Sequence, residues 1–101
     1  MTRPEFVSNE DILRWSEKID NDPLVPPELV EHPLIREVCY AGQWLNEKLV
    51  ELDCQDDIIG RIMYTAGAIC YGRPDPWIIH QNILQKFIEG TLEFENNSNS
   101  N

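Results

Sequence analysis

Residues 33–52 form the longest predicted helix of the chain and read PLIREVCYAGQWLNEKLVEL. Its apolar residues recur at steps of three and four, which places them on one face of an α-helix. They are Leu34, Ile35, Val38, Ala41, Leu45, Leu49 and Leu52. Pro33 suits the first position of such a helix, because a proline there loses no intrahelical hydrogen bond. The stretch therefore predicts one long helix with an apolar face to bury.

Helix-starting and helix-ending residues divide the rest of the chain. Ser8, with Asp11 three residues later, resembles a capping box. Residues 22–33 hold four of the seven prolines, so they predict a stiff connector with one helical turn at Glu28–Glu31. The other predicted helices run from about Asn9 to Asp20, from the acidic turn at 53–57 to Gly72, and from Asp75-Pro76 to Gly90. No stretch alternates polar and apolar residues, so the predicted fold is all-α: a small four-helix bundle with a proline-rich connector after its first helix.

Length and charge limit the function. The 101 residues are too few for a doubly wound nucleotide fold, and we expect one helical domain over residues 1–90 followed by a disordered polar tail, 91–101. Eighteen acidic residues against eight Lys and Arg give a formal net charge of -10. Because Lys and Arg nowhere cluster, the composition excludes direct binding to nucleic acid through its phosphates.

The chain carries no signal for a membrane or for secretion. The most apolar segment, residues 58–72, holds Arg61 and falls short of the ~20 residues that cross a bilayer. The three cysteines of the whole chain are odd in number and form no C-x-x-C pair, which is typical of reduced thiols in the cytoplasm. No Cys and His spacing fits a metal site and no glycine-rich phosphate loop occurs, so neither metal nor cofactor is expected.

Two aromatic residues interrupt the charged face of the long helix. Tyr40 and Trp44 lie four residues apart, and hence in contact, with Glu37, Glu47 and Glu51 around them. A large aromatic side chain within a polar rim is typical of a protein-binding hot spot. These five residues are therefore the candidate partner-binding site. The alternative is that the first helix or the proline-rich connector folds over the aromatic pair.

The third predicted helix carries a line of small residues. Gly60 and Gly67 lie seven residues apart, and Tyr64 and Tyr71 follow beside them with the same spacing. Such a line lets another helix backbone approach closely. The partner is either a neighbouring helix of the same chain, which we favour because the bundle is small, or the same helix of a second subunit.

Catalytic chemistry finds little support. Near His80 in sequence there is neither a nucleophile nor a carboxylate placed to orient the histidine as a base. This favours a hydrogen-bonded core residue over a catalytic one. Glu28 with Glu31, and Asp53 with Asp56, match the carboxylate spacing of all-α nucleotide pyrophosphohydrolases, although prolines and a turn deny them one long helix.

The leading hypothesis is a small, acidic, non-catalytic protein–protein interaction or regulatory module that binds a protein, basic or not, or a second copy of itself. One alternative is an acidic antagonist, of the kind found in phages or mobile elements, that imitates DNA and so occupies the binding cleft of a nucleic-acid-binding protein. The other is a metal-dependent nucleotide pyrophosphohydrolase.

Overall fold

The computed structural model describes residues 3–70 and 75–92, apart from the side chain of Val30. Over these ranges its only regular secondary structure is helical. The helices are α1 (Asn9–Asp20), α2 (Pro27–Val30), α3 (Pro33–Glu51), α4 (Asp56–Cys70) and α5 (Pro76–Glu89). The predicted all-α bundle is confirmed, with α2 as the single turn in the proline-rich connector. The polar tail lies almost wholly outside the described residues.

Local signals in the sequence account for the helix ends. The Ser8 hydroxyl accepts from the Asp11 backbone N–H, and the Asp11 carboxylate accepts from the Ser8 N–H, both at 3.1 Å. Asp75 likewise caps α5 by accepting from the Ile78 N–H at 3.2 Å. Gly90 ends that helix with a left-handed φ of 77°, a conformation that disfavours residues with a Cβ.

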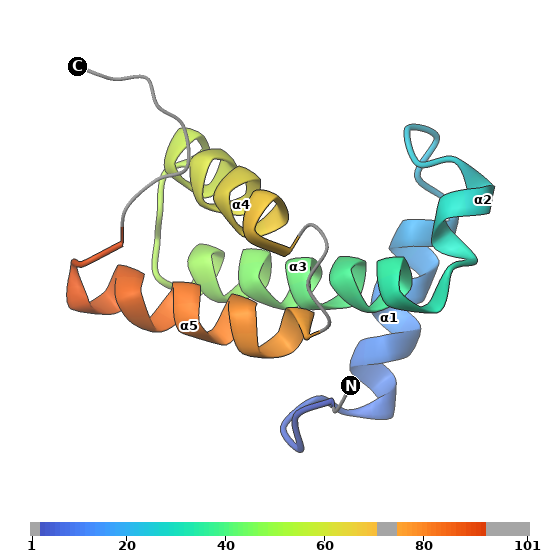
Figure 1. Ribbon diagram of the computed structural model, residues 1–101, viewed down its shortest axis with the longest axis horizontal. Helices are drawn as coiled ribbons and strands as arrows, with labels where there is room; N and C mark the ends of the chain where they lie inside the picture. The colour runs from blue at the N-terminus through green and yellow to red at the C-terminus, as the bar shows by residue number, and fades with distance from the viewer. Residues whose placement is uncertain (1–2, 71–74, 93–101) are drawn as a thin grey trace.

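The long helix α3 lies at the centre of the molecule, and the other four helices all pack against it. Figure 1 shows α1 crossing α3 near the start of α3 with α2 beside it, while α4 and α5 accompany the rest of α3. Among the described residues, α4 contacts α3 and α5, and α1 contacts α3 and α2. The chain thus covers two sides of α3 with different sets of helices.

The core forms where the apolar faces of these helices meet. Its buried members on the central helix include Ala41, Leu45 and Leu49, which lie on the predicted inner face. Ile62 and Ala66 of α4 are fully buried against them. Within the described residues, no helix has the length and apolar character that crossing a membrane requires.

Candidate functional site

Tyr40 and Trp44 are buried in the folded chain. Their exposed fractions are 6% and 7%, so the prediction that they form an exposed anchor is wrong. The alternative, that the N-terminal part of the chain folds over them, describes the structure. Trp15 of α1 lies with its ring centroid 6.5 Å from that of Tyr40, and the Phe6 ring lies 5.6 Å from that of Trp44.

An aromatic cluster joins three helices at this place. Trp77 of α5 contacts both Trp15 and Trp44, with ring centroids 6.2 Å and 6.3 Å apart. All three tryptophans of the chain therefore meet beside α3. Tilted and edge-to-face arrangements at such distances are favourable for aromatic rings, in addition to the area they bury.

Two glutamates of α3 complete this cluster. The Glu47 carboxylate accepts from Trp15 Nε1 at 2.9 Å, and the Glu37 carboxylate accepts from Trp77 Nε1 at 2.8 Å. Each also forms an ion pair with an arginine near the N-terminus: Glu47 with Arg14, and Glu37 with Arg3. We predicted both glutamates as a solvent-facing rim, whereas they are half-buried acceptors, because a buried indole N–H requires one.

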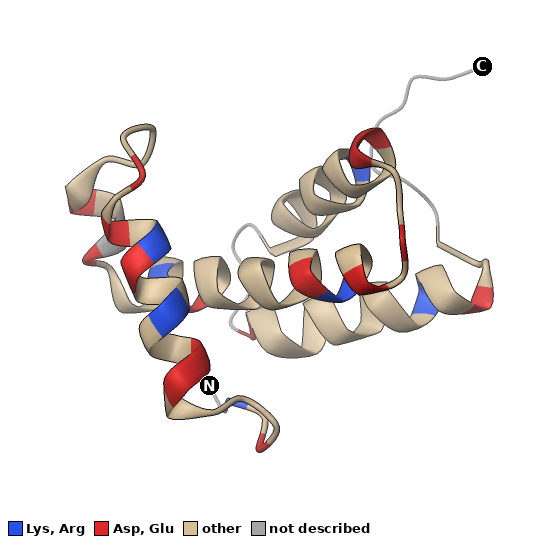
Figure 2. Cartoon of the chain, turned by 180° about the vertical axis from the view of Figure 1, so that it is seen from behind, with Lys and Arg blue, Asp and Glu red and all other residues tan. Residues whose placement is uncertain are grey.

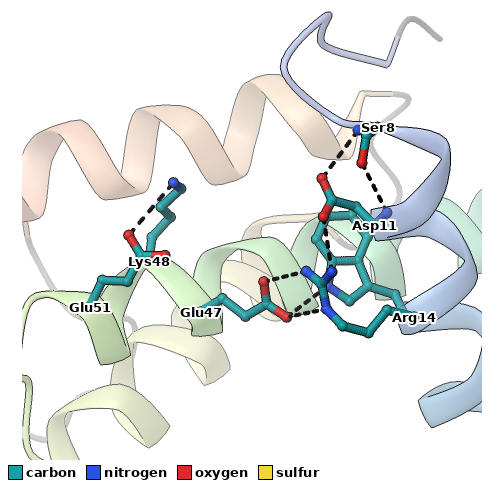
Figure 3. A network of polar contacts seen from close by, with 7 residues as sticks. Ser8, Asp11, Arg14, Glu47, Lys48 and Glu51 are labelled. Carbon is teal, nitrogen blue, oxygen red and sulfur yellow. Dashed lines mark hydrogen bonds and ion pairs between the residues drawn. The ribbon is translucent and has the colours of Figure 1, made fainter.

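The ion pairs continue outward from Glu47 along the surface (Figure 3). Arg14 lies 2.8 Å from Glu47 and 3.0 Å from Asp11, so it links the capping box of α1 to α3. Partial burial alone would raise the pKa of Glu47, but the hydrogen bonds from Arg14 and Trp15 lower it below its ordinary value. Glu51, by contrast, is exposed and pairs with Lys48 at 3.7 Å.

The polar end of Tyr40 is satisfied as well. Its hydroxyl shares a hydrogen bond with Ser16 Oγ and accepts from Arg36 Nε, both at 2.8 Å. Arg36 also donates to Asp20 at 2.7 Å, and this contact lowers the pKa of that carboxyl. The second half of α1 is therefore joined to α3 through hydrogen bonds from Ser16 and Asp20, four residues apart on one face of α1, to Tyr40 and Arg36.

An open cleft of about 400 Å³ lies beside the cluster. Its lining residues come from the N-terminal segment, α1 and α3: Phe6, Asp11, Arg14, Trp15, Trp44, Glu47, Lys48 and Glu51. Trp44 differs from the other two tryptophans because its Nε1 finds no acceptor within the part of the chain that the structure describes. A buried donor without an acceptor is rare in folded proteins.

The small-residue line of α4 faces outward. Among residues 3–70 and 75–92, a Cβ atom added at Gly60 or Gly67 would meet nothing within 4 Å apart from the helix itself, and Tyr64 is 67% exposed. The prediction that a neighbouring helix of the same chain covers this line is therefore wrong for these three residues. Tyr71 lies outside the described residues. We call Gly60, Tyr64, Gly67 and the exposed Ala68 the α4 outer face.

Charge is unevenly distributed over the molecule. Figure 2 shows carboxylates on α1, near α2, in the second half of α3 and around the start of α4. Residues 62–70 of α4 contain no charged residue. Tyr64, Gly67 and Ala68 of the α4 outer face thus lie in a segment without charge, as do residues 76–85 of α5, while exposed Arg61 follows Gly60 directly.

The remaining candidates for chemistry are His80 and the two carboxylate pairs. Among the described residues, no three His, Cys, Asp or Glu side chains come close enough to hold a metal ion, and the two carboxylate pairs lie on different elements, in or beside α2 and around the turn before α4. His80 is buried, and its Nδ1 lies 2.7 Å from the Pro76 carbonyl oxygen. Burial lowers the pKa of His80, so it is a neutral core residue, as its sequence context indicated.

Comparison with protein-family models, with curated proteins and with solved structures finds no match for this chain. The geometry of its own residues must therefore carry any functional argument. Two features stand out: the uncovered α4 outer face, and the cleft beside Trp44.

Proposed function

We propose that this chain is a small, non-catalytic interaction module that self-associates through the α4 outer face. The observation that supports it is the uncovered line of Gly60 and Gly67, beside an exposed Tyr64. Without side chains at two positions one above the other, a second helix can approach the backbone closely. An exposed tyrosine beside such a line supplies the amphipathic contact area that is enriched in interfaces.

The charge distribution favours a second copy of this chain as the partner. Two molecules that each carry a net charge of -10 repel one another over most of their surface. Repulsion is least where charge is absent, and residues 62–70 are such a place. A twofold axis passing near this segment would bring two identical uncharged segments together. Free cysteines and the acidic surface fit a cytoplasmic module of this kind.

Alanine substitution at the two glycines tests this proposal because it has opposite effects on the monomer and on the complex. In the monomer, Gly60→Ala and Gly67→Ala should each raise the free energy of unfolding by up to about 1 kcal/mol, since alanine is the better helix former and the added Cβ meets no neighbour. In the complex, the same methyl groups should prevent close approach and weaken self-association.

The measurement is the molar mass of the full chain by light scattering over a range of concentrations, beside urea unfolding. Gly42→Ala is the matched control: it lies in α3, and its added Cβ would make an ordinary 3.5 Å contact with Met63 Cε inside the fold. This control should leave the molar mass unchanged. A chain that stays monomeric at every concentration, or glycine variants that associate as the wild type does, would contradict the proposal.

An acidic antagonist of a basic, nucleic-acid-binding protein is the second candidate. It is supported by the carboxylates exposed along α1, near α2 and before α4. Such binding depends on long-range attraction, so it should weaken steeply with added salt. Association through the uncharged α4 outer face should instead depend little on salt.

A further inference from the structure

We propose that residues 3–7 form a displaceable strap over the cleft beside Trp44, and that this cleft binds a protein segment with the strap's own chemistry. That chemistry is an arginine followed three residues later by an aromatic residue, as in Arg3 and Phe6. The site is separate from the α4 outer face, so the proposal does not depend on self-association.

Side chains hold the strap in place. The Arg3 guanidinium forms an ion pair with Glu37 and lies 5.6 Å from the centroid of the Tyr40 ring. The Phe6 ring packs on Trp44 at 5.6 Å. Within the described residues, the backbone of the strap hydrogen-bonds only to itself, from Val7 N to Pro4 O at 3.1 Å. Recognition of α3 by this segment therefore rests on the Arg3 cation and the Phe6 ring, while Val7, at the end of the strap, packs against the hydrophobic core.

Both of these contacts are open to water. Phe6 is 56% exposed, so one side of its ring packs and the other faces solvent. Arg3 and its ion pair also lie at the surface, where screening by water and salt weakens the attraction. Displacing Arg3 and Phe6 therefore gives up little buried area, in contrast to α1, whose Trp15 is fully buried.

Trp44 is the observation that points to a missing ligand atom. The indole N–H groups of Trp15 and Trp77 each donate to a glutamate, but that of Trp44 has no acceptor among the described residues. Trp44 also lines the cleft, next to Phe6. The strap in its present position leaves this N–H without an acceptor, and a backbone carbonyl oxygen of a segment seated in the cleft would supply one.

Charge selects the kind of partner. Three carboxylates and two cations line the cleft: Asp11, Glu47 and Glu51, with Arg14 and Lys48 paired to them. Displacing the strap would add a fourth carboxylate, because Glu37 would lose its ion pair with Arg3. This environment repels phosphate groups and attracts a guanidinium, which also stacks well on tyrosine and tryptophan rings. A basic and aromatic peptide segment fits these surroundings, as the strap itself demonstrates.

The strap competes with such a partner within its own molecule. A group tethered by a short linker acts at an effective concentration on the order of millimolar, so it masks the cleft from a ligand of equal intrinsic affinity. Removing the two anchors should therefore reveal binding that the wild-type chain suppresses.

A synthetic peptide of residues 1–9 is the probe, added to the full chain labelled with ¹⁵N. The readout is the indole N–H signal of Trp44, identified by its loss in Trp44→Phe. In the double variant R3A/F6A the peptide should shift this signal and bind at least about tenfold more tightly than it binds the wild type. A control peptide in which alanine replaces the arginine and the phenylalanine should not bind.

Glu37→Gln, made in the double variant, provides a second control, since the amide oxygen can still accept from Trp77 Nε1 while the negative charge is lost. It should weaken peptide binding without unfolding the protein, as judged by far-UV circular dichroism. Equal affinity for wild type and R3A/F6A, absence of binding to both, or binding that ignores the arginine and phenylalanine would each overturn the proposal. Light scattering on the same samples reports self-association independently.

Discussion

Replacing Glu47 by alanine should lower the free energy of unfolding by about 1–4 kcal/mol. The larger share comes from Trp15, whose side chain is 1% exposed and whose Nε1 donates to Glu47 at 2.9 Å. Without that acceptor, a buried N–H remains unsatisfied, at a cost of about 1–3 kcal/mol. Loss of the partly exposed ion pair with Arg14 adds up to about 1 kcal/mol.

Two further variants separate these contributions. Glu47→Gln keeps an oxygen for Trp15 and loses the charge that pairs with Arg14, so it should cost about 1 kcal/mol or less. Glu17→Ala removes an exposed carboxylate of α1 and should change stability by no more than about 0.5 kcal/mol. Urea unfolding, followed by far-UV circular dichroism, measures all three.

The pH dependence of the same variants adds a check on sign. The pKa of Glu47 is lowered in the folded state, so its charge stabilises the protein above the ordinary value of 4.5 and ceases to do so as pH falls through the lower folded value. The stability difference between wild type and Glu47→Gln should thus be constant near neutral pH and narrow below about pH 4.5. If Glu47→Ala costs no more than Glu17→Ala, the carboxylate does not support the aromatic cluster and our account of it is refuted.

Three other predictions concern local features. The pKa of buried His80 is lowered, so the unfolded chain takes up a proton at a higher pH than the folded chain does. The free energy of unfolding should therefore fall as pH drops below about 6.5, by at most about 1.4 kcal/mol per pH unit. Urea unfolding of His80→Phe between pH 5 and 7 should lack this slope. Ser8→Ala removes the cap of α1 and should cost about 1 kcal/mol, whereas Ser8→Asp, which can still cap, should cost less in the same assay. Gly90→Ala places a Cβ at φ 77° and should lower thermal stability by about 1–2 kcal/mol, the opposite sign to Gly67→Ala, and equal effects of the two would contradict the strain argument.

Helix positions were predictable because their determinants are local. Ser8, Asp75 and Gly90 act within a few residues of themselves, and the structure uses each of them as the sequence indicated. The inner face of α3 was equally legible at Ala41, Leu45 and Leu49, since apolar spacing along one helix needs no knowledge of its neighbours. It was wrong for Leu52, which follows the end of the helix and is 49% exposed.

The burial of Tyr40 and Trp44 was not predictable in this way. A helical projection treats neighbouring glutamates as markers of solvent, whereas Glu37 and Glu47 face other side chains as hydrogen-bond acceptors. Those side chains are tryptophans far away in sequence. One signal was present in composition: three indole N–H donors in a small chain need acceptors, and carboxylates next to an aromatic pair can supply them.

The position of α1 also explains why the α4 outer face remains uncovered among the described residues. The stripe of α1 contains Trp15, and this ring finds its partners on the aromatic side of α3, next to Tyr40 and Trp77. A chain with four long helices cannot cover both places, so burying the aromatic side of α3 leaves the α4 outer face open.

Two sides of one helix thus connect the proposed surfaces. The apolar side of α3 holds α4 in place, with Gly60 and Gly67 directed away from it, and the aromatic side holds α1 and the strap. Among the described residues α1 makes no packing contact with α4, so a change at either surface reaches the other through α3, or through α5, whose Trp77 contacts Trp15 and which itself packs on α4. Sites without direct contact usually contribute to stability and binding nearly additively. We therefore expect a second copy on α4 and a peptide beside Trp44 to bind at the same time, each with nearly the affinity that it has alone.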